Sequence, residues 1–454
     1  MGINHIDKKS YSYLFLKQFV AFWHNRVFYR RVVIHNREQV PENAHLLYTG
    51  NHQNALMDAM VFLFGVKGRL VFMSRSDIFN KPIIASILYF FRMLPIFRIR
   101  DGYSSVKKND NIFLKTIDVI KNKIGLVIMA EGNHGSERRL RPLKKGFARI
   151  AFITEEANDF KLDMKIVPVG MDFSVYENFR SELLINFGKP IPVSDYYQVY
   201  KENPSIAINQ IKGTLAESLK SLMVQIKSEK HYQLYNEVRE IYKHEMAKKM
   251  GFPSAKQPYK LQADQELIRK MELFEENNPN QMDDFQELVV NYKKNILEQK
   301  IDYEIAGQKT TSYFRLICEF VLYLGSFPGF LVGWLFNYLP FGFSIYMANK
   351  VKDKQFHSSF KFAITLFLWP LWFIIVTTIF WFINRDVYLT LGFFVLIPVS
   401  GILARFYWTS FQHFLKKWRW TRLKDNQVTI YEKIRTVREQ IFAKVDSITT
   451  SLSQ

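Results

Sequence analysis

A histidine and an aspartate stand six positions apart near the start of the chain, in the stretch Asn51-His52-Gln53-Asn54-Ala55-Leu56-Met57-Asp58. A neutral imidazole can take a proton from a hydroxyl group, and a carboxylate on its other ring nitrogen fixes the tautomer and stabilises the imidazolium. Residues six apart lie about 240° apart around a continuous helix, so they do not share a face. The pair therefore requires His52 in a loop ahead of a helix, with the backbone folding Asp58 back. On its own, this spacing also suits a polar loop that caps a helix.

A second set of polar residues follows the apolar run Gly125–Ala130, which leads into Glu131 and Gly132 and then a basic stretch. A glycine-bearing turn with clustered cations can hold phosphate, because backbone N–H groups and cationic side chains are aimed at the same anion. We predict that the residues that bind phosphate or acceptor here are Glu131, Gly132, Arg138, Arg139, Lys144 and Lys145. Arg141 lies in the same stretch, and the sequence does not decide between it and Arg138 or Arg139. Alone, the cluster also suits a solvated face or a membrane-contact patch.

A further cationic site lies in the stretch from Pro95 to Gly102. Side chains alternate along an extended chain, so Arg98 and Arg100 are expected to point to the same side. We add both to the predicted phosphate contacts.

These residues need a scaffold that brings them together. Short apolar runs alternate with amphipathic stretches between residues 33 and 204, which indicates an α/β domain with a mainly parallel sheet and flanking helices. The expected strands are Leu46–Tyr48, Leu70–Met73, Leu126–Met129, Lys165–Val169 and Glu182–Phe187, and the expected helices include Ile83–Phe91, Ile112–Lys121 and Ala148–Ala157. Ligand sites in such sheets lie beyond the carboxyl ends of the strands. His52, Arg98 and Glu131 each follow an apolar run, as that rule requires.

Four blocks in this region occur in the order of a known family. They are Asn51-His52 with Asp58, Leu94–Arg98, Glu131-Gly132 through Pro142–Gly146, and Ile166–Gly170 with Ile185–Ile191. With these blocks the chain resembles the membrane glycerophospholipid acyltransferase family, the glycerol-3-phosphate and lysophosphatidate acyltransferases. The family's usual first block has four residues between His and Asp, and this chain has five. That spacing and the long C-terminal membrane region resemble the fungal-type glycerol-3-phosphate/dihydroxyacetone-phosphate acyltransferases.

The resemblance implies transfer of a fatty acyl group from acyl-CoA or an acidic acyl-carrier protein to a hydroxyl of glycerol 3-phosphate or dihydroxyacetone phosphate, in phospholipid biosynthesis. It implies that His52 is the general base, that Asp58 orients it, and that Arg98 binds glycerol phosphate. No metal ion and no cofactor besides the thioester co-substrate are expected. Backbone N–H groups near Glu131–Gly135 are expected to stabilise the oxyanion. Two alternatives stay open: a lysophosphatidate or other lysolipid acyltransferase, and a non-catalytic membrane scaffold or lipid-binding protein.

The formal net charge is +20 over 454 residues, which indicates acidic partners such as anionic lipid, phosphorylated substrates or an acidic carrier. The charge is dispersed and accompanied by membrane spans, so we do not expect a nucleic-acid partner. The single cysteine, Cys318, excludes intramolecular disulfides. A covalent acyl-enzyme is not expected, because Cys318 lies in an apolar stretch and there is no Gly-x-Ser-x-Gly motif.

Composition divides the chain into five segments. We expect an interfacial amphipathic helix at 1–32, the α/β acyltransferase domain at 33–204, a helical insert at 205–311, a membrane domain at 312–408 and a basic cytoplasmic helical tail at 409–454. The apolar stretches at about 314–341, 360–383 and 387–404 approach or exceed the roughly 18–20 residues that a spanning helix needs.

Charge sets the predicted topology. Basic residues follow the first apolar stretch (Lys350, Lys352, Lys354) and the third (Lys416, Lys417), and three full spans would place both groups outside, against the positive-inside rule. A re-entrant turn at Gly325-Ser326-Phe327-Pro328-Gly329 keeps both inside and leaves the other two stretches as a spanning pair. The N-terminus lacks signal-peptide features. We therefore expect an integral membrane protein with its catalytic domain on the cytoplasmic face.

Overall fold

The computed structural model describes residues 6, 10–97, 109–133, 135 and 137–451. The chain divides into two compact units, which are described separately below. The first consists of Met1–Gln225 with Ala348–Phe362, and the second of Ile226–Met347 with Ala363–Gln454.

An eight-stranded sheet forms the centre of the described part of the first unit. Its strands are β1 (Arg31–His35), β2 (Leu46–Gly50), β3 (Leu70–Arg75), β4 (Met93–Ile96), β5 (Gly125–Val127), β6 (Lys165–Phe173), β7 (Glu182–Phe187) and β8 (Ile191–Pro192). Their order is β1-β7-β6-β2-β5-β3-β4, with β8 beside β6. Pairing is parallel except for β6 with β7 and β6 with β8. The predicted α/β fold with a mainly parallel sheet is confirmed.

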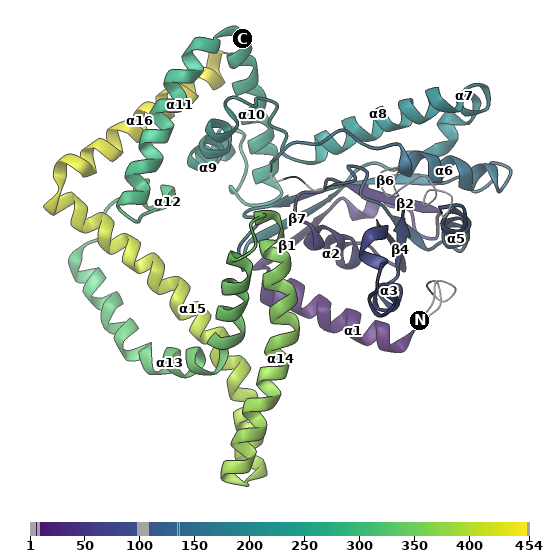
Figure 1. Ribbon diagram of the computed structural model, residues 1–454. Helices are drawn as coiled ribbons and strands as arrows, with labels where there is room; N and C mark the ends of the chain where they lie inside the picture. The colour runs from purple at the N-terminus through teal and green to yellow at the C-terminus, as the bar shows by residue number, and fades with distance from the viewer. Residues whose placement is uncertain (1–5, 7–9, 98–108, 134, 136, 452–454) are drawn as a thin grey trace. The chain divides into compact units, whose positions relative to one another are not determined.

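Helices cover both faces of this sheet, as apolar strands buried on two sides require. They are α1 (Tyr11–Phe22), α2 (Leu56–Gly65), α3 (Pro82–Phe90), α5 (Asn109–Lys121), α6 (Gly146–Glu156), α7 (Tyr197–Glu202) and α8 (Pro204–Leu222), with short 3-10 or π turns at η2 (Trp23–Phe28), η3 (Arg37–Gln39), η4 (Ser76–Phe79) and η6 (Val193–Tyr196). In Figure 1, α6 and α8 lie on one side of the sheet and α2 and α3 on the other.

Helix α8 corrects one predicted boundary. We expected the helical insert to begin at residue 205, but the apolar face of α8 is fully buried in the core beside the sheet, through Ala207, Ile211, Leu215 and Leu219. The first part of this unit therefore extends to Gln225. An amphipathic helix shows the same spacing whether it packs on a sheet or on another helix, so sequence alone could not place it.

The first helix keeps large apolar side chains on its surface. Tyr11 is 90% exposed, Phe15 79% and Phe22 58%. Its inner side packs through Tyr13, whose ring meets that of Phe90 at the end of α3 with the centroids 6.1 Å apart. This exposure suits the predicted interfacial helix, which stays a prediction.

All regular elements in the described part of the second unit are helices. Its helices outside the membrane candidates are α9 (Tyr232–Lys249), α10 (Tyr259–Asn277), α11 (Pro279–Glu298), α12 (Tyr303–Ala306) and α16 (Val428–Ser451). Helix α16 was expected in a separate tail, yet it packs against α10 and α11. Its buried side chains include Ile434, Ile441 and Val445. The tail is therefore part of the helical bundle.

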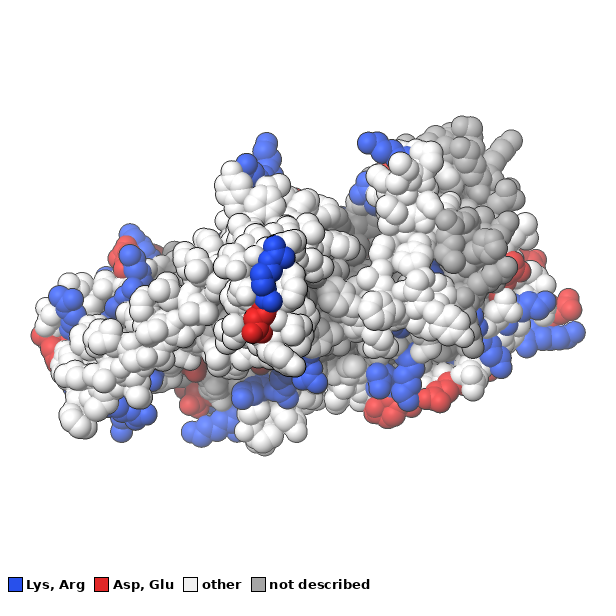
Figure 2. Space-filling view, turned by 90° about the horizontal axis from the view of Figure 1, so that it is seen from below, with Lys and Arg blue, Asp and Glu red and all other residues white. Residues whose placement is uncertain are grey.

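Among the described residues, three helices are long and apolar enough to cross a membrane: Tyr313–Asn349, Lys354–Asn384 and Val387–Asn426. They comprise α13 (Tyr313–Asn349), the 3-10 turn η7 (Lys354–Phe356) with α14 (His357–Asn384), and α15 (Val387–Asn426). Many of their large apolar side chains are exposed, including Phe314, Leu322 and Phe367. Figure 2 shows broad areas of the surface without Lys, Arg, Asp or Glu. A bilayer would cover such side chains, because they cost free energy in water.

Helix α13 differs locally from the expected turn. Residues 325–329 are helical, with Pro328 and Pro340 both inside α13. A proline inside a helix removes one backbone hydrogen bond and bends the helix without always ending it. Figure 1 shows α13 running down and then back up through a wide bend. The predicted re-entrant path is not decided by this geometry and stays a prediction.

Candidate active site

The imidazole of His52 and the carboxylate of Asp58 meet just beyond strand β2. His52 Nδ1 lies 2.8 Å from Asp58 Oδ2. His52 follows β2 in an irregular loop, while Asp58 occupies the first turn of α2. The backbone thus folds Asp58 back onto His52, as the spacing required. Because Nδ1 faces the carboxylate, Nε2 is the ring nitrogen that can serve a substrate.

The carboxylate of Asp58 also organises the loop itself. Its Oδ2 accepts hydrogen bonds from the backbone N–H groups of Gln53 at 2.9 Å and Asn54 at 2.7 Å. The Asp58 side chain is fully buried, whereas that of His52 is 17% exposed. A negative charge in the first turn of a helix is stabilised by the helix dipole. The arrangement holds a fixed carboxylate behind an imidazole that solvent can still reach.

Glu131 joins the histidine loop to the basic turn. Its Oε1 accepts the backbone N–H of His52 at 2.7 Å, and its Oε2 accepts that of Arg141 at 3.1 Å. Burial raises the pKa of Glu131 to about 7, although the two N–H donors oppose that shift. We predicted that Glu131 binds the substrate phosphate, but its oxygens face these backbone groups. Glu131 instead links the backbone of the His52 loop to the backbone of the basic turn at Arg141.

Two glycines bring the basic turn close to His52. The Gly135 N–H donates to the His52 carbonyl at 3.0 Å. Gly132 has a φ of +73°, where a side chain would be strained, and an added Cβ there would meet Lys144 Cγ at 3.2 Å. The Gly132 N–H already donates to the Met129 carbonyl at 3.1 Å. The expected oxyanion donors therefore do not include the N–H groups of Gly132 and Gly135.

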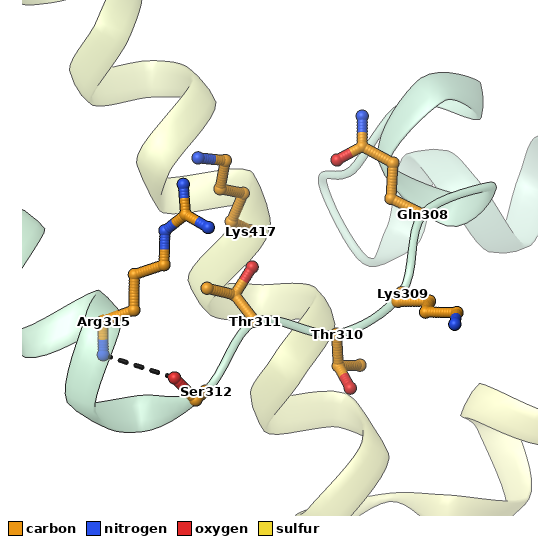
Figure 3. Close-up of a pocket in the computed structure, with 7 residues that line it drawn as sticks. All are labelled: Gln308, Lys309, Thr310, Thr311, Ser312, Arg315 and Lys417. Carbon is orange, nitrogen blue, oxygen red and sulfur yellow. Dashed lines mark hydrogen bonds between the residues drawn. The ribbon is translucent and has the colours of Figure 1, made fainter.

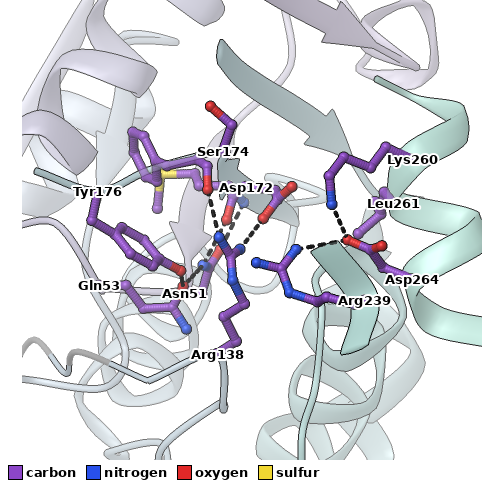
Figure 4. A network of polar contacts seen from close by, with 12 residues as sticks. Asn51, Gln53, Arg138, Asp172, Ser174, Tyr176, Arg239, Lys260, Leu261 and Asp264 are labelled. Carbon is purple, nitrogen blue, oxygen red and sulfur yellow. Dashed lines mark hydrogen bonds and ion pairs between the residues drawn. The ribbon is translucent and has the colours of Figure 1, made fainter. Parts of the chain in front are cut away.

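Arg138 does not lie where we predicted. Its guanidinium is buried, donates to the Asp172 carboxylate and donates at 2.6 Å to the Phe173 carbonyl (Figure 4). It also lies over the ring of Tyr176, 5.0 Å from the centroid. A buried arginine paired in this way is costly to pull into solvent, so Arg138 is not available to bind phosphate.

The other cations of the basic turn have different surroundings. Arg141, Lys144 and Lys145 are exposed, and an added Cβ on Gly135 would meet Arg141 Cδ at 3.1 Å. Arg141 thus lies beside the glycine that contacts His52, which singles it out among the three arginines left open. Arg139 lies 3.6 Å from the carboxylate of Glu137. Arg98 and Arg100 fall outside the described residues.

The sequence reasoning missed a polar network that fixes the residues around His52. Asn51 exchanges two hydrogen bonds with the backbone of Met171 on β6, at 3.0 and 2.7 Å. Gln53 accepts from the Tyr176 hydroxyl at 2.7 Å and donates to the Glu137 carbonyl at 2.8 Å (Figure 4). Adjacency to His52 is the only sequence signal that could have singled out Asn51 and Gln53.

Two polar features of the second unit contain none of the predicted site residues. One is a cavity of about 460 Å³ at the start of α13, lined by Gln308–Ser312, Arg315 and Lys417 (Figure 3). Its Arg315 and Lys417 lie within 3.5 Å of the Glu319 carboxylate. The other is a buried ion pair between Arg239 and Asp264 at 2.7 Å, which Lys260 also joins (Figure 4). Both are internally paired, and we assign no chemistry to them.

Comparisons with known proteins concern the segment that carries this site. The family model described as "Acyltransferase" matches residues 31–172. Glycerol-3-phosphate O-acyltransferase 1 from Saccharomyces cerevisiae is 26% identical over 28% of this chain, and glycerol-3-phosphate O-acyltransferase 2 from the same yeast is 27% identical over 26% of it. The aligned segments make up only 17% and 16% of the lengths of these two relatives.

One solved structure to which the chain is similar is the 1-acyl-sn-glycerophosphate (LPA) acyltransferase PlsC from Thermotoga maritima. It is 17% identical with a TM-score of 0.32, over 46% of this chain and 81% of that one. The matched family segment, residues 31–172, runs from β1 into β6 and holds His52, Asp58 and Glu131. Residues 31–172 thus match an acyltransferase domain, and this part of the chain is similar to glycerophospholipid acyltransferases.

Proposed function

We propose that this chain moves a fatty acyl group from a thioester donor, acyl-CoA or acyl-carrier protein, to a hydroxyl of glycerol 3-phosphate or dihydroxyacetone phosphate. The observation that carries the proposal is the His52–Asp58 pair at the carboxyl edge of the sheet, with a basic turn attached to it through Glu131. The names of the two yeast relatives support the choice of acceptor.

The proposed chemistry is a direct transfer. His52 Nε2 removes the proton from the acceptor hydroxyl as its oxygen attacks the thioester carbonyl carbon. The tetrahedral intermediate then collapses, the carbon–sulfur bond breaks, and the leaving thiolate takes the proton back from the imidazolium. Asp58 holds the ring in the required tautomer and stabilises its charge throughout.

The acceptor phosphate would bind at the basic turn. Arg141, Lys144 and Lys145 expose their side chains there, and Arg141 lies next to Gly135, which touches the His52 carbonyl. Holding the phosphate at this point would place a neighbouring hydroxyl at the imidazole and convert a bimolecular step into a local one. Arg98 and Arg100 are proposed to complete the phosphate site.

A side-by-side acceptor assay tests the proposal. The purified full-length chain in lipid vesicles receives labelled acyl-CoA or acyl-carrier protein, with glycerol 3-phosphate, dihydroxyacetone phosphate or lysophosphatidate as acceptor. We expect acylated product with glycerol 3-phosphate or dihydroxyacetone phosphate. Product with lysophosphatidate alone would show that the acceptor is a lysolipid and not a glycerol phosphate. No product with any acceptor would favour a non-catalytic scaffold.

We also propose that both ends of α13 lie on the cytoplasmic side, together with the acyltransferase domain. Residues 348–362 belong to the same compact unit as that domain. Between Gln225 and Tyr313, where every residue is described, no helix is long and apolar enough to span a membrane. Both observations support the proposal that α13 starts and ends on one side of the membrane, as a bent re-entrant helix would.

Cysteine labelling tests this topology. In a Cys318→Ser background, Lys352→Cys tags the loop before α14 and Arg385→Cys tags the turn between α14 and α15; both positions are exposed. In intact cells, an impermeant thiol reagent should label Arg385→Cys and not Lys352→Cys. Labelling of Lys352→Cys from outside would overturn the proposed path.

A further inference from the structure

The start of α14 belongs to the acyltransferase domain. Although most of α14 lies in the second unit, its first residues fall in Ala348–Phe362, which belongs to the first. There Ser358 is fully buried, Ser359 is 7% exposed and Phe362 is 1% exposed. An apolar membrane helix therefore begins inside the domain that carries His52.

Two serines of this first turn hold the histidine loop on either side of Ala55. The Ser358 hydroxyl donates to the side-chain oxygen of Asn54. The Ser359 hydroxyl accepts the backbone N–H of Leu56 at 3.2 Å. Leu56 is the first residue of α2, and Ala55, at the capping position, provides no side-chain acceptor. The Ser359 hydroxyl on α14 thus accepts a hydrogen bond from the start of α2, in place of a capping side chain at residue 55.

The peptide between these two contacts is strained. Ala55 has φ of +46° and ψ of −118°, a region that residues with a Cβ rarely occupy. Such a conformation is unfavourable and persists only where the surroundings enforce it. Ser358 holds the residue before Ala55 and Ser359 holds the residue after it. The two hydroxyls thus help to hold Ala55 in this conformation.

The held segment leads directly to the catalytic pair. The backbone N–H of Asn54 donates to Asp58 Oδ2 at 2.7 Å, on the same oxygen that faces His52. Asp58 follows Leu56 by two residues in the first turn of α2. Relaxation at Ala55 would therefore move the carboxylate relative to the imidazole.

The turn that carries the two serines is itself fixed. Lys361 Nζ donates to the Glu177 carbonyl at 2.8 Å, and His357 Nε2 lies 2.9 Å from the Val351 carbonyl oxygen. The ring of Phe362 meets that of Phe28 with the centroids 5.4 Å apart. These contacts give the serines a defined position in the domain.

We infer that Ser358 and Ser359, in the first turn of membrane helix α14, are positioning residues that set the geometry of His52 and Asp58. The inference rests on the proposed acyl transfer for its kinetic readout. It assigns to a membrane helix a direct part in shaping the site.

A pair of isosteric variants tests this inference. Ser359→Thr keeps a hydroxyl next to Leu56, while Ser359→Val has the same size and no acceptor. We expect Ser359→Val to lower kcat by about 2- to 30-fold, the range of a lost helix cap, with little change in KM for the donor. Ser359→Thr should stay near wild type, as should Ser326→Ala, whose hydroxyl bonds only within its own helix. Equal kcat for the Thr and Val variants would overturn the inference.

Hydrogen–deuterium exchange gives a readout that does not need turnover. Amides of Gln53–Met57 should exchange faster in Ser359→Val and in Ser358→Ala than in wild type, while those of Ile166–Met171 on β6 stay unchanged. Unaltered exchange at Gln53–Met57 in both variants would contradict the positioning role. An inactive wild type that still shows this local exchange effect would instead contradict the proposed function alone.

Discussion

The loop that carries His52 is held from two sides, and the two sides differ in origin. On one side Asp58 and Glu131 bind its backbone and its imidazole from within the acyltransferase segment. On the other side Ser358 and Ser359 bind Asn54 and Leu56 from the start of a membrane helix, about 300 residues further along the chain.

The two sides also differ in the chemistry that they supply. Asp58 and Glu131 offer buried carboxylates, of which the first fixes the tautomer of His52 and the second accepts the His52 backbone N–H. The serines offer neutral hydroxyls, which hold the Asn54 side chain and the Leu56 backbone. The first side should therefore control whether proton transfer occurs, and the second how well the reacting groups are aligned. Each prediction below changes a residue of the acyltransferase segment.

The largest of these effects is expected for Asp58→Asn. An asparagine amide can donate to His52 Nδ1, which would leave the proton on Nε2, where the base needs a lone pair. We expect kcat to fall by about 10²–10⁴-fold, with the fold retained in circular dichroism. A variant that retains wild-type kcat would show that Asp58 does not set the tautomer.

Substitutions of Arg141 and Arg138 should differ in effect: the first should weaken acceptor binding, and the second should lower stability. Arg141→Ala removes an exposed cation beside Gly135 and should raise KM for the acceptor about 10- to 100-fold, since a charge-assisted hydrogen bond contributes about 1.5–3 kcal/mol. Arg138→Met leaves Asp172 buried without its partner arginine and should lower the free energy of unfolding by about 3–5 kcal/mol.

The matched control is Arg149→Ala, which removes an exposed arginine on α6 outside the basic turn. It should leave both KM and stability close to wild type. The assignment of the two arginines would be reversed if Arg138→Met raised acceptor KM while the Arg141 variant unfolded more easily.

A further effect is expected from Glu131→Gln, measured as the change of stability with pH. Burial raises the pKa of Glu131 from 4.5 to about 7, so the folded state holds a proton that the unfolded state has lost between those values. Wild-type stability should therefore fall as pH rises from 4.5 through 7, by at most about 3 kcal/mol. Thermal unfolding of the two proteins across this range should show a shallower decline for Glu131→Gln. Parallel curves would mean that Glu131 does not titrate as its burial indicates.

Local pattern was enough to predict the His52–Asp58 pair. The spacing of His52 and Asp58 required the fold-back that the structure contains, and apolar runs located five of the strands. Strands β1, β4 and β8 were missed because Arg31–His35 continues a basic amphipathic stretch, Met93–Ile96 is short and contains a proline, and Ile191–Pro192 is very short. Each gains its place only by pairing with a neighbour, which a local pattern does not show.

Contacts between residues far apart in the sequence could not be predicted from local pattern. Arg138 looked like its basic neighbours because its partner Asp172 lies 34 residues away on strand β6. Ser358 lies 304 residues from Asn54 in an apolar helix whose composition indicates only a membrane. No residue type or spacing near either serine marks a role in the site. Such positions become visible only when the fold brings the two segments together.

The central claim is that His52 is the base of an acyl transfer. The most direct measurement compares wild type and His52→Ala under single-turnover conditions, with labelled acyl thioester and saturating glycerol 3-phosphate, and verifies the fold of each by circular dichroism. The account predicts acyl transfer by wild type and a rate at least about 10²–10⁴-fold lower for the variant. Wild-type transfer by a folded His52→Ala protein would contradict it.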